Sequence, residues 1–378
     1  LFGFVYGWTL LLAINTGFVA AVAVAFAKTL GFFVPGVGEE HVLVSVPGAT
    51  FSTAQLVALV VIAVLTWLNV TGLRTGAVVQ NVFTITKLGA LAVLVALAVL
   101  TAKGSSANFD PLLSLALGPE GLKVGLFAAL AGAMSKALFA YDSWYTVTFA
   151  AEEVKDPERN LPRSLVLGTL GVTVAYGATV AAYIYLVPIG QMAGIAENRI
   201  ATEAAGRMIG PAGGAFIAAA ILVSTFGCVN GLTLAGARVV YAMARDGLFF
   251  RGVARVHPRH RTPASALLLH GLVAGVLTLT GTYSDLLTMT AFSSLLFNVL
   301  TVIGLFVLRR RRPDLPRPYR AWGYPVVPLL FVAVAAFFLV YMPVADPRNT
   351  GLGLLLTATG VPAYLFWRRP GKSHDPLT

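Results

Sequence analysis

The chain of 378 residues is strongly apolar: 57% of its residues are hydrophobic, its mean hydropathy is +0.80 and only 11% are charged. A soluble globular protein of this size does not need so much apolar surface, so the composition predicts a polytopic membrane protein. The net charge of +11 does not indicate a nucleic-acid-binding protein, because most basic residues gather in loops on one side of the predicted membrane.

Apolar stretches long enough to cross a bilayer recur along the chain without the alternation that is typical of a membrane β-barrel. We expect an all-α fold with about ten spans, near residues 1–30, 54–72, 78–101, 124–151, 163–188, 212–244, 264–281, 285–308, 325–343 and 352–367. If residue 1 lies on the cytoplasmic side, the loop 189–211 lies outside the cell. We expect this loop to contain a short amphipathic helix. The loops are short, so residues 1–378 are predicted to form a single membrane domain.

Lys87 stands in the middle of the apolar segment 78–101. An ionisable side chain at that depth is costly unless it faces a polar interior, so it usually marks function. Gln80, Thr84 and Lys87 follow the i, i+4, i+7 spacing of one helix face. We therefore expect Lys87 to face inward. The alternative is that its side chain extends along the helix to the membrane interface.

A second feature is the segment 124–155, which is long for one span and carries Asp142 and Ser143 in its middle. These residue types favour helix N-caps over helix interiors. We predict a broken helix whose first half ends near Ala140 and whose second half starts at Trp144, capped by Asp142 or Ser143. Such a break exposes backbone groups that suit an ammonium and a carboxylate. A kinked but continuous helix is the alternative.

Catalytic and metal-binding patterns are absent from the sequence. Cys228 is the only cysteine, which excludes an intrachain disulfide and a Cys-rich metal site. The histidines do not have zinc-protease spacing, and no nucleophile stands near a base. We therefore predict no enzyme, no cofactor and no metal site; a membrane-embedded enzyme is the rival class.

Several stretches, in this order, resemble amino acid permeases of the amino acid–polyamine–organocation superfamily, in particular the L-type amino acid transporter branch. The match runs along nearly the whole chain. The stretches are NVTGLRTG (69–76), FAYDSW (139–144) with EEVKDPERNLPRSL (152–165), STFGCVNG (224–231) with ARVVYAMARDG (237–247), and RRRRPDLPRPYRAWGYPVVP (309–328).

The resemblance implies a fold of twelve spans, built as two inverted five-helix repeats and a final helix pair. Matching the spans in order makes residues 1–30 the third span, so the first two are expected to be missing from this chain. Residues 1–101 would form a partial first repeat, residues 122–308 the second repeat and residues 325–367 the final pair. A non-transporting fragment or partner subunit is therefore an alternative to a complete transporter.

The implied function is alternating-access transport of amino acids, small or neutral ones. The implied substrate-binding residues are Phe139, Ala140, Tyr141, Asp142, Ser143, Tyr145 and Phe292. Phe139 would be the outer gate, and the carbonyls from Ala140 to Ser143 would receive the α-ammonium. Ser143 stands where many members have glycine, which would favour small substrates. Phe292 is alternatively a packing residue.

By the same resemblance, Lys87 would occupy the place of a sodium ion, with Ser224 and Cys228 facing it. A Lys87 that stays charged predicts a sodium-independent exchanger or facilitator. A Lys87 that releases its proton on burial could instead couple transport to protons. Glu152 and Glu153 would form an inner gate with Arg238; a solvated loop end is the alternative.

The expected partners are an amino acid substrate and the lipid bilayer. Animal members of this branch join a heavy chain through a cysteine after the third span, whereas residues 31–53 contain none. We therefore expect no disulfide-linked heavy chain, a prokaryotic origin and a multi-pass protein of the cell membrane.

Overall fold

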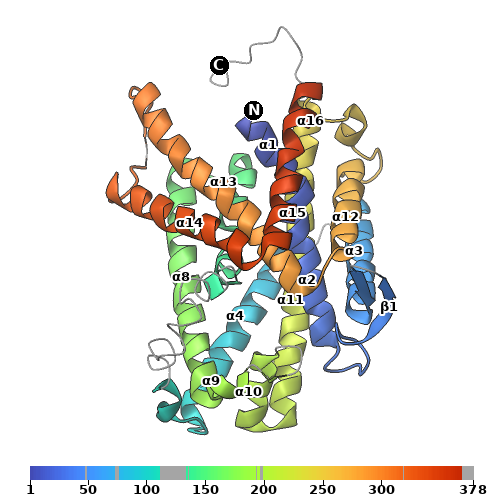
Figure 1. Cartoon of the computed structure of the whole chain (residues 1–378), viewed down its shortest axis with the longest axis vertical. Coiled ribbons are helices and arrows are strands. Elements are labelled where there is room, and N and C mark those ends of the chain that lie inside the picture. Colours follow the sequence, from blue (N-terminus) through green and yellow to red (C-terminus); the bar gives the residue numbers. More distant parts are fainter. Residues whose placement is uncertain are drawn as a thin grey trace.

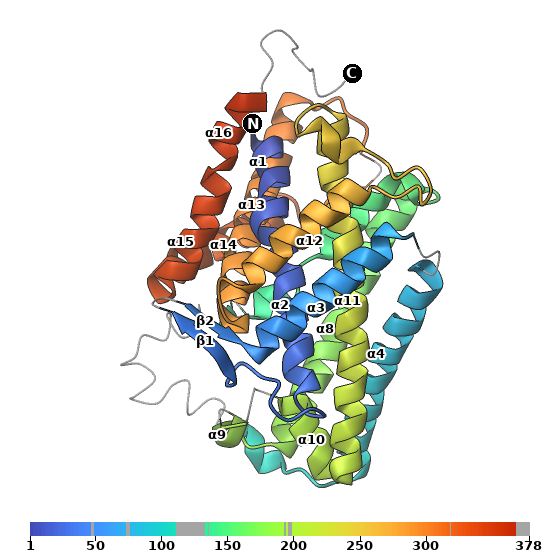
Figure 2. The ribbon, with the colours of Figure 1, turned by 90° about the vertical axis from the view of Figure 1, so that its right-hand side faces the viewer.

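A computed structural model describes residues 1–46, 49–72, 76–110, 133–134, 136–192, 194–195, 199–317 and 319–367. Figures 1 and 2 show long helices packed side by side. The N-terminus and α16 lie at one end of the molecule, and α9 and α10 lie at the other. In chain order the elements are α1 (Phe2–Thr9), η1 (Leu10–Ile14), α2 (Asn15–Leu30), β1 (Val42–Val46), β2 (Ala49–Ser52), α3 (Thr53–Val70), α4 (Gly76–Leu100), η2 (Ser106–Phe109), η3 (Trp144–Glu153), α8 (Pro157–Leu186), α9 (Ile189–Met192), α10 (Ile200–Ile209), α11 (Pro211–Arg245), η5 (Arg251–Ala254), α12 (Ala264–Thr278), α13 (Tyr283–Arg311), α14 (Val326–Ala345), α15 (Pro347–Ala358) and α16 (Gly360–Trp367).

Seven helical stretches among the described residues are long and apolar enough to cross a membrane. They are Phe2–Leu30, Thr53–Val70, Pro157–Leu186, Pro211–Arg245, Tyr283–Arg311, Val326–Ala345 and Pro347–Trp367, and the shorter apolar helices are Thr84–Leu100 and Ala264–Thr278. Each coincides with a predicted span. The all-α, polytopic membrane fold is therefore confirmed, while residues 124–132 of the predicted fourth span lie outside the described part of the chain.

The core is built around α2, which packs against α3, α11, α12 and α13. Most alanines and valines of α2 are completely buried, and small side chains let neighbouring helices approach closely. At the centre, His270 on α12 and Asn15 on α2 are joined by a buried hydrogen bond of 2.8 Å between Nε2 and Oδ1. Gly236 on α11 lies against both side chains, leaving no room for a Cβ atom.

The first span is less regular than predicted. Its helix widens to a π-helix over η1, and Thr16 donates its hydroxyl hydrogen to the Leu11 carbonyl five residues earlier. Single π-turns occur inside α-helices and are frequent at functional sites. Asn15, which contacts His270, directly follows this turn. The irregular turn therefore lies next to the buried polar pair.

A β-hairpin in the segment 31–53 was not predicted. Strand β1 pairs antiparallel with β2, with Val44 opposite Phe51 and Ser45 opposite Thr50. The alternation in VLVSV was the available signal. Ser52 then begins α3 through a capping box with Gln55, whose amide also donates to the Thr278 carbonyl at 2.8 Å. The hairpin thus leads directly into a helix that is fixed to the end of α12.

One other boundary differs from the predictions. The last span starts at Pro347 rather than near residue 352, because Asp346 caps it by accepting a hydrogen bond from the Asn349 backbone. The predicted helix in the outer loop 189–211 is present as α9 and α10. It lies at the end of the molecule farthest from the N-terminus, as the alternation of spans requires (Figure 1).

Candidate functional site

The predicted interruption of the helix is present between Ala140 and Trp144. Residues 136–140 are helical, and the backbone N–H groups of Tyr141 and Asp142 still donate to carbonyls of this turn. Ser143 then adopts the left-handed conformation, with φ of 65°. A serine pays a steric penalty in that region, so a helix cannot continue through it. The chain resumes at Trp144 as the 3₁₀ helix η3 rather than as an α-helix.

The predicted cap on the second half is wrong. No side chain caps η3. The Asp142 carboxylate instead accepts a hydrogen bond from the next backbone N–H, that of Ser143, at 2.6 Å. The Ser143 carbonyl accepts two local hydrogen bonds from Thr146, one from its backbone N–H and one from its hydroxyl. Because Ser143 is left-handed, the Asp142 carboxylate bonds to the adjacent backbone N–H instead of capping the first N–H groups of η3.

The interruption leaves two backbone acceptors open. The Ala140 carbonyl accepts from the Tyr176 hydroxyl at 3.1 Å, and the Ser143 carbonyl accepts from Thr146. Among the described residues, no hydrogen bond engages the carbonyls of Tyr141 and Asp142. Unpaired carbonyls at a break in a membrane helix are suited to receive a cation such as an ammonium group.

Polar side chains from other elements surround the interruption. The Asp142 carboxylate lies near the side chains of Ser294 on α13 and Tyr145, but the Ser294 hydroxyl makes no hydrogen bond within the described residues. Tyr145 is buried and meets the ring of Tyr6 on α1 edge to face, with 6.5 Å between ring centres. The first span and α13 therefore both contact the interrupted segment, which comprises residues 136–153 on both sides of the break.

Aromatic packing holds the start of the interruption. The Phe139 ring lies 4.6 Å from the ring of Phe18 on α2 and also joins an apolar cluster of α13 and α14. Phe292 belongs to that cluster and is only 6% exposed. The structure thus places Phe292 close to Phe139 but packed among apolar side chains, as the alternative interpretation of Phe292 expects.

Lys87, Ser224 and Cys228 line one cavity of about 280 Å³ between α4, α11 and η3. Gly227 and Gly231 form part of its wall, where the lack of side chains leaves space. Thr146 also lines it. Since Thr146 bonds to Ser143, the cavity adjoins the interrupted segment. The cavity of Lys87 is therefore next to the interruption, although none of the residues predicted to bind substrate lines it.

The predicted inner gate is only partly described. Arg238 is exposed on α11, whereas the side chains of Glu152 and Glu153 lie outside the described part of the structure, as does that of Gln80. The pairing of Arg238 with these carboxylates stays a prediction. In the described residues no group of three or more His, Cys, Asp or Glu side chains could hold a metal ion.

Sequence reasoning missed four residues of this region: Tyr6, Thr146, Tyr176 and Ser294. Only Thr146 carried a local signal, because it follows Ser143 by three residues and can reach back to its carbonyl. The others come from separate spans, so their approach depends on the packing of α1, α8 and α13 against the interruption.

A family model described as amino acid permease matches residues 1–362. Large neutral amino acids transporter small subunit 2 of Rattus norvegicus is 31% identical over 329 residues, covering 86% of this chain and 60% of the relative. Serine/threonine exchanger SteT of Bacillus subtilis is 28% identical over 364 residues, covering 96% and 77%. Branched-chain amino acid permease BcaP of the same species is 30% identical over 352 residues, covering 90% and 71%.

The chain thus spans about 60% of the length of the mammalian relatives that it matches. Because the matched residues include the interrupted segment and the cavity beside Lys87, both features fall within the shared region. The chain belongs to the amino acid permease family, within the amino acid–polyamine–organocation superfamily.

Proposed function

We propose that this chain transports small or neutral amino acids by alternating access, as an exchanger or facilitator that does not use sodium. The observation that carries the proposal is the interrupted segment, in which the carbonyls of Tyr141 and Asp142 accept no hydrogen bond within the described residues and Thr146 lines the cavity of Lys87. The carbonyls would receive the α-ammonium. The names of the relatives, which mention neutral, branched-chain and hydroxyl amino acids, support neutral substrates.

Lys87 is proposed to act as a fixed cation. In this role its ammonium group would hold α4 against α11, through Ser224 and Cys228, at the place where sodium stands in sodium-coupled members. A permanent charge needs no bound ion and so predicts transport that is indifferent to sodium. A Lys87 that exchanges its proton during the cycle is the alternative, and it predicts coupling to a proton gradient.

The remaining site residues are proposed to act as gates and to shape the pocket. Phe139 would close the outer side, because its ring already contacts Phe18 across the segment. Ser143 would narrow the pocket. Arg238 would close the inner side with Glu152 and Glu153. The absence of cysteine from residues 31–53 supports the proposal that no heavy chain is linked by a disulfide. We propose that the protein belongs to a prokaryotic cell membrane.

Counterflow in proteoliposomes tests transport. Vesicles preloaded with unlabelled neutral amino acids are offered labelled leucine or serine, in sodium and in choline buffer. We expect accumulation that is equal in both buffers. Accumulation only by a version extended upstream of Leu1 would support the fragment interpretation, and no accumulation by either version would overturn transport. Faster uptake in sodium would overturn sodium independence alone.

Lys87→Met tests the lysine, with Lys155→Met as the matched control, because Lys155 is an exposed loop residue on the same chain. We expect the exchange rate of the Lys87 variant to fall at least about ten-fold, because the variant loses a group that stabilises the working conformation. The control should keep its exchange rate. A flat response to an imposed proton gradient supports the fixed charge; stimulation by the gradient supports the proton carrier.

A further inference from the structure

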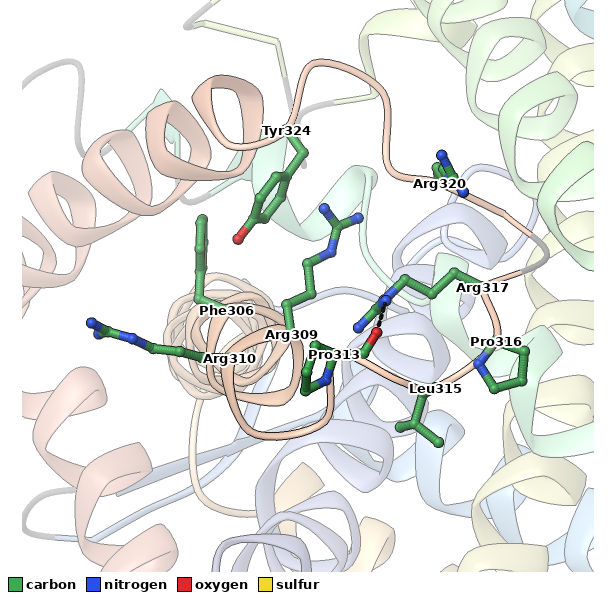
Figure 3. Close-up of a pocket in the computed structure, with 9 residues that line it drawn as sticks. All are labelled: Phe306, Arg309, Arg310, Pro313, Leu315, Pro316, Arg317, Arg320 and Tyr324. Carbon is green, nitrogen blue, oxygen red and sulfur yellow. Dashed lines mark hydrogen bonds between the residues drawn. The ribbon is translucent and has the colours of Figure 1, made fainter.

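A basic pocket lies on the inner side of the molecule, at the end of α13. Its volume is about 920 Å³, and it lies between the last turns of α13 and the loop that leads to α14. Four arginines and no acidic residue line it among the described residues. The lining residues are Phe306, Arg309, Arg310, Pro313, Leu315, Pro316, Arg317, Arg320 and Tyr324 (Figure 3).

Arg309 is held in a position that suits an anion. Its guanidinium carbon lies 3.7 Å from the centre of the Tyr324 ring, so the ring fixes the plane of the guanidinium group. Its Nε atom is buried and has no hydrogen-bond partner within the described residues. A buried donor without an acceptor is unfavourable, so a shift of the Arg309 side chain that brings this nitrogen to a ligand oxygen would be favourable.

Arg317 shapes the pocket from the loop side. Its guanidinium donates to the carbonyls of Pro313 and Arg312, each at 2.9 Å. These bonds fold the loop back on itself and still leave N–H groups free, because a guanidinium has five. Figure 3 shows Arg309 and Arg317 facing a common space with Arg320 at its rim, while Arg310 points away.

The chemistry of the pocket selects a phosphate group. Planar guanidinium groups bind phosphate through paired hydrogen bonds, and several close arginines repel one another until an anion lies between them. The same loop also presents Tyr319 to a second hollow, which is lined by Arg159 and Arg163 together with Glu158 on α8. Basic residues therefore surround the loop on both sides, and the local potential favours an anion.

The position of the pocket identifies the source of the phosphate. Arg309 belongs to the last turn of a membrane-spanning helix, which places it at the depth of the lipid headgroups. Phe306 and Leu315 add apolar walls that suit the glycerol end of a lipid. We propose that this pocket binds the phosphate of an anionic phospholipid headgroup, so that a lipid joins the end of α13 to the loop before α14. The proposal does not depend on transport.

The test is direct binding to the full chain in detergent. The anisotropy of tail-labelled phosphatidylglycerol is measured, with tail-labelled phosphatidylcholine as the lipid without net charge. The test variant is Arg309→Gln with Arg320→Gln, which leaves the loop bonds of Arg317 intact. The matched control is Arg251→Gln with Arg255→Gln, two exposed arginines of another inner loop that do not line the pocket.

We expect phosphatidylglycerol to bind more tightly than phosphatidylcholine. The test variant should lose about thirty-fold in affinity, since each arginine near the headgroups contributes about five-fold. The control should change by less than about two-fold. If the double variant does not fold, Arg320→Gln alone, at the exposed rim, is expected to lose about five-fold. Unchanged binding by the folded test variant would overturn the proposal.

Competition separates the two sources of phosphate. Inorganic phosphate and glycerol 3-phosphate are titrated against bound phosphatidylglycerol. If both compete only weakly, the ligand is the lipid, because its tails contribute to binding. If inorganic phosphate displaces the lipid at comparable concentration, the lipid assignment is overturned in favour of a soluble phosphate.

Discussion

Two regions of this molecule differ in how tightly the surrounding protein encloses their polar groups. The scaffold, which we define as α2, α3, α11 and α12, buries the pair of Asn15 and His270 in a space with no room for one further carbon atom at Gly236. The interrupted segment, residues 136–153, instead leaves the carbonyls of Tyr141 and Asp142 open. Because unpaired backbone groups at membrane depth are tolerated only beside a cavity or within protein, we propose that the scaffold supports the fold and that the interrupted segment binds the substrate.

The largest effect should come from adding one carbon to the scaffold. A Cβ atom at Gly236 would collide with His270 Nε2 and Asn15 Oδ1. Gly236→Ala should therefore overpack the core and break the hydrogen bond between the two side chains, with a loss of about 3 kcal/mol of unfolding free energy. Unfolding by denaturant in detergent micelles measures the loss.

The control for this substitution is Gly168→Ala on α8, where a Cβ atom would meet nothing within 4 Å. Alanine has the higher helix propensity, so the control should be neutral or slightly stabilising. A loss at position 168 equal to that at position 236 would show that the scaffold is no more tightly packed than α8.

The next effect concerns the buried pair itself. His270→Ala should cost about 2 kcal/mol, because the imidazole is fully buried and Asn15 would lose its partner. A double-mutant cycle with Asn15→Ala should give a coupling of about 1 kcal/mol, the usual range for hydrogen bonds between membrane helices. Additive losses would contradict the idea that the pair joins α2 to α12.

These features also show what the sequence can and cannot reveal. The spans, the break between Ala140 and Trp144 and the approach of Lys87 to Ser224 and Cys228 could be predicted, because apolar length, capping chemistry and a known family pattern are local or shared signals. The pair of His270 and Asn15 could not be predicted, since 255 positions separate the two residues and no local pattern links them.

Other differences between prediction and structure arise where a side-chain contact depends on the conformation of several residues at once. Asp142 and Ser143 were expected to cap the second half of the broken helix, but the left-handed turn at Ser143 directs the carboxylate to a backbone N–H of its own turn. Tyr6 and Ser294 reach the interruption only through tertiary packing. The sequence thus located the break, whereas its side-chain contacts depend on the neighbouring spans.

A smaller effect, of opposite sign, is expected within the interrupted segment. Ser143→Gly should stabilise the protein by about 1 kcal/mol, because glycine adopts a φ of 65° without the penalty that a Cβ atom brings. Ser164→Gly, on the exposed part of the helix α8, should destabilise it by about 0.5 kcal/mol. Thermal unfolding in detergent compares the two, and a loss in both would argue against strain at Ser143.

The smallest effect tests the contrast between the regions most directly. Tyr176→Phe removes the hydroxyl that donates to the Ala140 carbonyl and keeps the ring that meets Tyr141 edge to face at 5.3 Å. Protein atoms do not enclose this bond, so we expect water to replace it and the loss to stay within about 0.5 kcal/mol. The bond between Asn15 and His270 has no such replacement, so its removal should cost several times more. If the two losses prove equal in the same unfolding assay, solvent does not reach the interrupted segment, and its open carbonyls are not available to a ligand from the aqueous side.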